Sequence, residues 1–167
     1  MGVRALPPPV QTMLFLIFRL DQDRYALNAA EVVEVLPLGP LKSLPNTPAW
    51  VAGVFSYHGQ LVPVIDMPSL ALGRPAYRRL STRTVVVRYQ PADTESDSKL
   101  LAIIVEQVTR TMRRDPADFT ACGIATPQAR YLGPVASDPA GLVQWISVQS
   151  LLPEDVKSML FVAEADT

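Results

Sequence analysis

Residues 53–66 read GVFSYHGQLVPVID, two apolar runs separated by a short polar turn. The runs flank His58-Gly59 with the spacing of a two-residue β-hairpin, in which glycine supplies a positive φ angle. Pro63 has no backbone N–H to donate, which predicts an edge strand or a bulge at this position. The stretch therefore predicts a β-hairpin that carries the only histidine of the chain in its turn.

Short strand-forming runs recur along the rest of the chain, separated by glycine, proline and polar residues. They occupy residues 13–20, 25–27, 32–36, 84–89, 100–105, 108–112, 131–133 and 143–148. The first run, MLFLIFRL, is apolar on nearly every side, which predicts a strand covered on both faces. Many short strands without a βα alternation predict a mainly β fold, built from barrels or a sandwich.

Helical signals are few and short. Asn28 is placed to cap one helical turn, and Asp66 is placed to cap a short helix that ends at Gly73 in a left-handed conformation. Pro153, followed by two acidic residues, marks the start of a C-terminal amphipathic helix that we expect to pack on the sheets. The apolar face of this helix is predicted to contain Val156, Met159 and Leu160.

The composition fits a compact globular protein. The chain has 167 residues, of which 49% are hydrophobic, and this length suits one domain or two small subdomains that pack together. Fifteen Lys and Arg against sixteen Asp and Glu give a formal net charge of −1. Such a chain has no overall positive field that attracts phosphate backbones, so we expect no nucleic acid as partner.

The N-terminal residues predict a lead into the domain. Residues 1–11 contain three consecutive prolines, which favour an extended and poorly ordered segment, and we expect the folded domain over residues 12–167. The apolar run MLFLIF is far shorter than the roughly 20 residues that cross a bilayer. MGVRALPPPV also lacks the apolar stretch and cleavage site of a secretion signal. We therefore expect a cytoplasmic protein without membrane insertion.

The residues needed for catalysis or metal binding are largely missing. Nucleophilic catalysis needs a serine or cysteine beside a base, and His58 is expected in an exposed turn. Cys122 is interpreted as a small buried hydrophobe, and one thiol with one histidine cannot supply the ligands of a zinc site. Asp66 follows an apolar strand as phosphate-accepting aspartates do, but a helix cap is the favoured interpretation. We expect no catalytic residue, metal or cofactor.

Three blocks of the sequence resemble the CheW-like domain of bacterial chemosensory systems. They are YALNAAEVVEVL at 25–36, LPNTPAWVAGVFSYHGQLVPVIDM at 44–67 and RTVVV at 83–87, and the similarity runs over most of residues 13–152. The central block carries the family signature, a Pro-Xaa-Trp-Val-Xaa-Gly-Val segment, a turn that ends in glycine and a Val-Pro-Val-Ile-Asp strand. The matching positions are Pro48, Trp50, Val51, Gly53, Val54, Gly59, Val62, Pro63, Val64, Ile65 and Asp66.

The resemblance implies a fold of two intertwined five-stranded, SH3-like barrels. It also implies a non-catalytic adaptor that couples the cytoplasmic tips of methyl-accepting chemoreceptors to the regulatory domain of a CheA-type histidine kinase, beside membrane-bound receptor arrays. The receptor groove between the barrels is implied to include Val32, His58, Ala102 and Val108. The surface that faces the kinase is implied to include Glu34, Leu36, Leu41 and Gly53.

One position departs from the family pattern. The family turn usually reads Asn-Leu-Arg-Gly, and its arginine contributes to receptor binding, whereas this chain reads Ser56-Tyr57-His58-Gly59. A permanent charge is replaced by a side chain that titrates near neutral pH. We hypothesise that this variant serves a non-flagellar array of the Wsp-like kind with its own matched receptor.

Two rival functions stay open. One is a small β-barrel enzyme or ligand-binding module with a site at the groove between the barrels, which needs polar groups that converge there. The other is a binder of single-stranded nucleic acid, because small barrels can stack bases on aromatic side chains. The net acidic chain, with lysine only at positions 42, 99 and 157, opposes the second.

Overall fold

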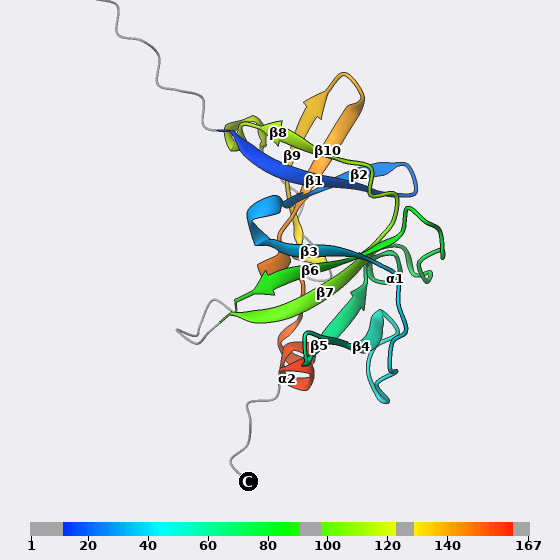
Figure 1. Cartoon of the computed structure of the whole chain (residues 1–167). Helices are drawn as coiled ribbons and strands as arrows, with labels where there is room; N and C mark the ends of the chain where they lie inside the picture. Colours follow the sequence, from blue (N-terminus) through cyan, green and yellow to red (C-terminus); the bar gives the residue numbers. More distant parts are fainter. Residues whose placement is uncertain (1–11, 91–97, 123–128, 162–167) are drawn as a thin grey trace, which may run out of the picture.

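The computed structural model describes residues 12–90, 98–122 and 129–161, and within these ranges ten strands form two five-stranded sheets (Figure 1). The strands are β1 (Met13–Leu20), β2 (Asp23–Asn28), β3 (Val32–Pro37), β4 (Val51–Tyr57), β5 (Gln60–Asp66), β6 (Arg83–Tyr89), β7 (Lys99–Val105), β8 (Arg110–Arg114), β9 (Leu132–Asp138) and β10 (Gly141–Ile146). The α-helices are α1 (Met67–Leu72) and α2 (Glu154–Leu160), and the 3-10 turns are η1 (Ala29–Glu31), η2 (Pro116–Asp118) and η4 (Val148–Ser150). The predicted mainly β fold is confirmed.

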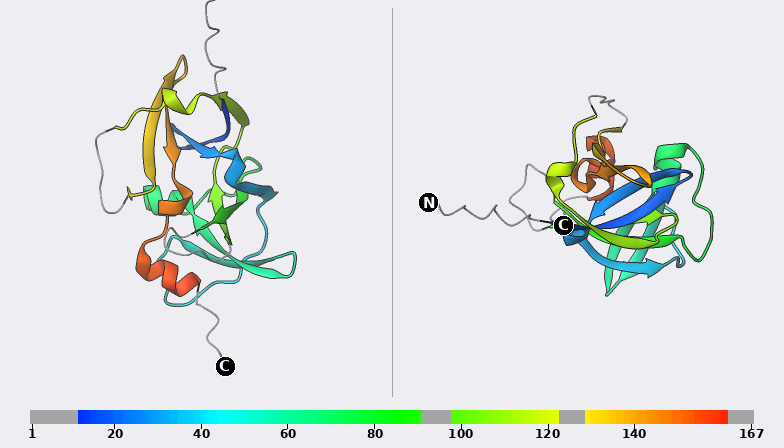
Figure 2. Two further views of the ribbon diagram at one scale, coloured as in Figure 1. Left: turned by 90° about the vertical axis from the view of Figure 1, so that its left-hand side faces the viewer. Right: turned by 90° about the horizontal axis from the view of Figure 1, so that it is seen from above.

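The chain interleaves the two sheets. It forms β1 and β2 of one sheet, crosses to build β3 to β7 of the other, and returns for β8 to β10. The strand orders are β8-β1-β2-β10-β9 and β3-β6-β7-β5-β4. Each sheet curls into a small barrel, and the two barrels stack one above the other (Figure 2). We call them the first barrel and the second barrel, in the order in which the chain enters them.

Each barrel is closed by the segment that follows one of its edge strands. Thr120, after β8, exchanges two backbone hydrogen bonds of 2.9 Å with Val135 on β9. Lys42, after β3, exchanges two backbone hydrogen bonds of 2.8 Å with Val54 on β4. In each of the two sheets, a pair of backbone hydrogen bonds therefore connects one edge to the other.

Alternating side chains on the strands fill three cores. On β1, Phe15 and Ile17 belong to a cluster made only of first-barrel residues, whereas Leu16 and Phe18 belong to a large cluster shared by both barrels. A third cluster, which includes Ala102, is made of second-barrel residues and the loops beside them. Because successive side chains of a strand point to opposite faces, one apolar strand supplies two cores. This explains why MLFLIFRL is apolar on both sides, as predicted.

The predicted helix caps are confirmed. Asn28 accepts a hydrogen bond from the backbone N–H of Ala30 at 3.0 Å. Asp66 accepts one from Ser69 at 3.0 Å, and Gly73 ends α1 with φ of 73°. These caps form from neighbouring residues alone, so they do not depend on distant packing.

The C-terminal helix differs in part from its prediction. The side chain of Val156 is buried in the core shared by the barrels, and Leu160 packs against that core. Met159, predicted on the same face, is 49% exposed. The prediction for Met159 is therefore wrong, because α2 has seven residues and buries only a narrow stripe.

Four other strand predictions need correction. The strand predicted over 143–148 is β10, which begins at Gly141 and ends at Ile146, and Val148 begins the 3-10 turn η4. The strand predicted over 108–112 begins at Arg110 and ends at Arg114, in the register set by its partner β1. The strand predicted over 131–133 continues to Asp138, because β9 pairs with β10 along its length. Pro63 lies on an interior strand, not on an edge: β5 lies between β4 and β7, and its pairing with β7 begins at Val64, one residue after the proline.

Candidate functional site

Three adjoining depressions at the closing seam of the second barrel share Leu41 and form one continuous surface, here called the Leu41 hollow. The apolar side chains along it are Leu36, Leu38, Pro40, Leu41, Phe55 and Leu61. The widest depression encloses about 540 Å³, and Leu61 is 71% exposed. An apolar hollow open to solvent is typical of a surface that binds a partner.

The hollow is shaped by the close approach of the segment after β3 to β4. Gly53 lies beside the pair of hydrogen bonds between Lys42 and Val54, with φ of 143°. A Cβ atom at Gly53 would lie 2.3 Å from the carbonyl oxygen of Lys42. Glycine is therefore needed here by both the backbone angle and the available space.

The hairpin between β4 and β5 forms as predicted, and Tyr57 pairs with Gln60 across the two-residue turn. Both turn residues have positive φ, 48° at His58 and 79° at Gly59. This is the pattern of a type I′ turn, whose twist matches that of the strands. The His58 side chain is 78% exposed at the tip.

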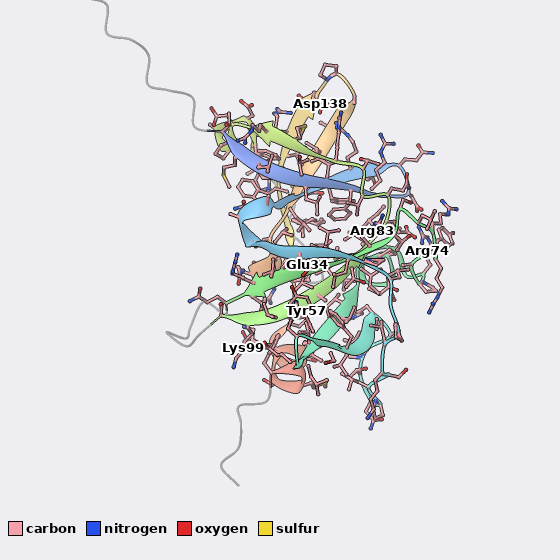
Figure 3. The ribbon with its side chains drawn as sticks, viewed as in Figure 1. Glu34, Tyr57, Arg74, Arg83, Lys99 and Asp138 are labelled. Atoms are coloured by element: carbon pink, nitrogen blue, oxygen red, sulfur yellow. The ribbon has the colours of Figure 1, made fainter. Side chains whose placement is uncertain are left out.

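A carboxylate on β3 faces this turn. The Tyr57 hydroxyl donates a hydrogen bond to Glu34 Oε1 at 2.5 Å, and His58 Nε2 lies 4.0 Å from the same oxygen. The hydrogen bond to Glu34, with the negative charge of that carboxylate, raises the pKa of the Tyr57 phenol. Figure 3 shows Glu34 and Tyr57 close together on the second barrel. This cluster connects the two edge strands of the barrel at one end of the Leu41 hollow.

The residues predicted to face the kinase lie in one region. Leu36 and Leu41 line the same depression, and Glu34 precedes Leu36 by two residues on β3. A Cβ atom at Gly53 would lie 2.3 Å from the Lys42 carbonyl oxygen and 3.5 Å from the Leu41 Cβ, so Gly53 is close to both residues. The structure thus brings this set together around the Leu41 hollow.

The residues predicted for the receptor groove are more dispersed. Val32 and Val108 are partly buried and pack against the core shared by the two barrels. Ala102 is fully buried in the core of the second barrel, so its side chain offers no surface. His58 lies at the hairpin tip beside Glu34, which was predicted for the other partner. Val32 and Val108 are partly accessible and His58 is exposed, whereas Ala102 belongs to a different core from the one that Val32 and Val108 pack against.

Four of the six apolar residues along the hollow were missed from the sequence, namely Leu38, Pro40, Phe55 and Leu61. Leu61 carried a signal, because it is an apolar residue beside the hairpin turn, where strands are normally polar. Phe55 alternates with Tyr57 along β4, and their ring centroids lie 6.1 Å apart. Without knowledge of the closing seam, no local pattern relates these residues to Leu41.

The buried charges in other regions support the fold. Arg24 makes two hydrogen bonds to Asp138, of 3.0 and 2.6 Å, within the first barrel. Glu106 is 4% exposed and accepts hydrogen bonds from Arg74 and from the backbone of Tyr77. Such paired groups satisfy buried polar atoms and stabilise the fold.

Three features bear on the expected chemistry. Cys122 is exposed, so its interpretation as a buried hydrophobe is wrong. No group of three or more His, Cys, Asp or Glu that could hold a metal ion occurs among the residues described by the structure. Across the same ranges, none of the helices has the length and apolar character needed to cross a membrane.

The chain is similar to several known proteins. It is 38% identical to Protein FrzA of Myxococcus xanthus over 53 residues, 32% of this chain and 33% of that protein. It is 25% identical to chemotaxis protein CheW of Helicobacter pylori over 111 residues, 65% of this chain and 62% of that protein. The matched parts thus span less than two thirds of either relative.

A solved structure confirms the fold. The scaffolding protein TtCheW from Thermoanaerobacter tengcongensis is 20% identical and has a TM-score of 0.76, with 96% of this chain and 98% of that chain covered. The likeness shows the fold of two SH3-like barrels, as the resemblance implied. A family model described as the CheW-like domain matches residues 14–156, which is most of the sequence. The chain therefore belongs to the CheW-like domain family.

Proposed function

We propose that the protein is a non-catalytic adaptor that couples methyl-accepting chemoreceptors to a CheA-type histidine kinase in a chemosensory array. Family membership over residues 14–156 supports an adaptor of chemotaxis-type signalling. The observation that carries the proposal is the Leu41 hollow, an exposed apolar surface that is lined by Leu36 and Leu41 and lies beside Glu34 and Gly53, the residues implied to face the kinase. In this function the protein is cytoplasmic and peripheral to membrane-bound receptor arrays.

The proposal assigns the two partners to different surfaces. The kinase regulatory domain binds at Glu34, Leu36 and Leu41, over the seam that Gly53 makes possible. The receptor tip binds along Val32 and Val108 and reaches the hairpin turn at His58, and Ala102, which has no exposed surface, is not part of this surface. The domain that carries both surfaces is proposed to extend over residues 12–167, and the lead at 1–11 lies outside the described residues.

Binding measurements with purified partners test the adaptor function. We expect the full chain to bind a receptor cytoplasmic fragment and the kinase regulatory domain at the same time, measured by biolayer interferometry. Because an exposed side chain of this kind contributes modestly, His58→Ala should weaken receptor binding roughly fivefold and leave kinase binding unchanged. A chain that binds neither partner would contradict the proposed function.

The identity of the array remains a separate prediction. The Wsp-like assignment follows from His58 in place of the usual arginine, so it predicts preference for a matched receptor. We expect tighter binding to a Wsp-type receptor fragment than to a flagellar receptor fragment, with His58→Arg reducing the difference. Equal affinities would contradict the assignment without affecting the adaptor function.

A further inference from the structure

Arg78 lies at one end of the Leu41 hollow and is exposed. It lines a depression of about 280 Å³ together with Leu38, Leu41 and Asp66. Asp66 forms no ion pair with Arg78, and its two carboxylate oxygens accept the N–H groups of Ser69 and Ala76, both at 3.0 Å. In the described ranges of the chain, no carboxylate forms an ion pair with Arg78.

The other two arginines of the same loop have roles within the protein. Arg74 donates to Glu106 and to Asp21, each at 2.8 Å, and its guanidinium lies 3.9 Å from the centre of the Tyr77 ring. Arg79 lies 5.0 Å from the same ring and does not line the hollow. Arg78 therefore differs from its neighbours in facing the hollow with an uncompensated charge.

The backbone around Arg78 is fixed by buried groups. Glu106, which is 4% exposed, accepts the Tyr77 N–H at 2.7 Å. Thr82 Oγ1 donates to the Tyr77 carbonyl at 2.6 Å, and Asp66 holds the Ala76 N–H on the other side. Because the loop backbone is already ordered, binding through the Arg78 side chain costs little additional backbone entropy.

A carboxylate lies beside the hollow without lining it. Glu34 precedes Leu36 on β3, and Leu36 shares a depression with Leu41. Leu41 in turn shares a depression with Arg78. Lys42, which is exposed, lines the widest depression. The surface thus has a carboxylate beside one depression and a cation in each of the other two, and such an uneven charge distribution can distinguish the two orientations of a partner.

We propose that Arg78 is a specificity-determining residue of the Leu41 hollow. The segment that covers the hollow presents apolar side chains, with an acidic residue opposite Arg78 and a basic residue opposite Glu34. This inference rests on the proposed kinase binding, and it adds the charge pattern and the orientation of the partner segment. A lipid surface is disfavoured, because the two basic residues of the hollow, Arg78 and Lys42, are fewer than the roughly four to eight of segments that bind anionic lipids.

Charge reversal at two adjacent arginines tests the inference. The full chain is titrated with the kinase regulatory domain by calorimetry at low and at high salt. Arg78→Glu should weaken binding roughly tenfold at low salt and less at high salt, since exposed charges are screened. Arg79→Glu is the matched control, with the same change on the same loop, and should stay within about twofold of the wild type.

A second variant separates charge from fold. Arg78→Lys keeps the charge and should stay within roughly threefold of the wild type. Replacing the acidic residue of the kinase segment by arginine should restore binding to Arg78→Glu. If Arg78→Glu binds as Arg79→Glu does, while the wild type binds, the inference is overturned and kinase binding stands. If the wild-type chain does not bind the kinase domain, the proposed kinase binding fails and the inference fails with it.

Discussion

At the scale of single residues, Gly53 shows how the closing seam restricts the sequence. Its φ of 143° is rarely adopted by residues with a Cβ, and a Cβ here would lie 2.3 Å from the Lys42 carbonyl oxygen. We predict that Gly53→Ala lowers the free energy of unfolding by about 3 kcal/mol, from backbone strain and overlap together. Chemical denaturation followed by circular dichroism measures this change.

Gly59 provides the control. It also has positive φ, but a Cβ there would meet no atom within 4 Å. Gly59→Ala should therefore lower the free energy of unfolding by only about 1 kcal/mol. Equal losses in the two variants would show that the contact with Lys42 is unimportant.

The pKa of the Tyr57 phenol depends on the Glu34 carboxylate. Because the phenol donates to a carboxylate whose negative charge disfavours the phenolate, the pKa of Tyr57 is raised above its ordinary value of 10.0. Glu34→Ala removes both effects, so the pKa of Tyr57 should fall toward 10.0. A pH titration of ¹³C-labelled tyrosine by NMR measures this shift. Asp118→Ala, on the first barrel, should leave the Tyr57 titration unchanged.

At the scale of elements, a buried ion pair links β2 to the end of β9 across the intervening strand β10. The Arg24 side chain is 5% exposed and that of Asp138 is 15% exposed. We predict that Asp138→Asn lowers the free energy of unfolding by roughly 2 kcal/mol at pH 7, because it leaves the guanidinium without a counter-charge. Asp118→Asn, which removes an exposed ion pair with Arg114, should have a much smaller effect.

The same pair predicts a dependence on pH. The hydrogen bonds from Arg24, with the nearby charge of Arg114, lower the pKa of Asp138 below its ordinary value of 3.8. The stabilisation is therefore complete above pH 3.8 and is lost as the pH falls through the lower folded-state value. The stability difference between the wild type and Asp138→Asn should stay constant between about pH 7 and 5 and decrease below about pH 4. Urea denaturation at several pH values measures this difference, and a constant difference down to pH 2 would contradict the assignment.

The elements that could be predicted from sequence are those fixed by neighbouring residues. The cap at Asp66, the left-handed Gly73 and the turn at His58-Gly59 depend on local geometry, and all three were predicted correctly. The limits of β8 and the length of β9 depend on distant partners, and both were misjudged. Local chemistry specifies a turn, whereas the register of a strand is fixed by the strand beside it.

At the scale of the whole molecule, the site cannot be predicted from local sequence patterns, because the interleaved barrels bring together segments that are distant in the chain. The parallel pairs β2 with β10 and β5 with β7 join segments that no periodicity relates. The resemblance implied both the barrels and the positions of Glu34, Leu36 and Leu41. It did not reveal that His58 lies beside Glu34, or that Leu61 and Arg78 belong to the same hollow, because these relations arise only when the second barrel closes.

The two barrels also offer a matched test of where the kinase binds. Leu61 on the second barrel is 71% exposed and lines the Leu41 hollow, and Leu142 on the first barrel is 67% exposed and lies outside it. We predict that Leu61→Asp weakens binding of the kinase regulatory domain at least tenfold, because central apolar residues carry most of the affinity of an interface. Leu142→Asp should stay within about twofold, since it changes an equally exposed leucine outside the proposed interface. Both variants should keep the wild-type unfolding temperature, because neither side chain is in a core. If Leu142→Asp caused the larger loss, the kinase surface would have to be assigned to the first barrel.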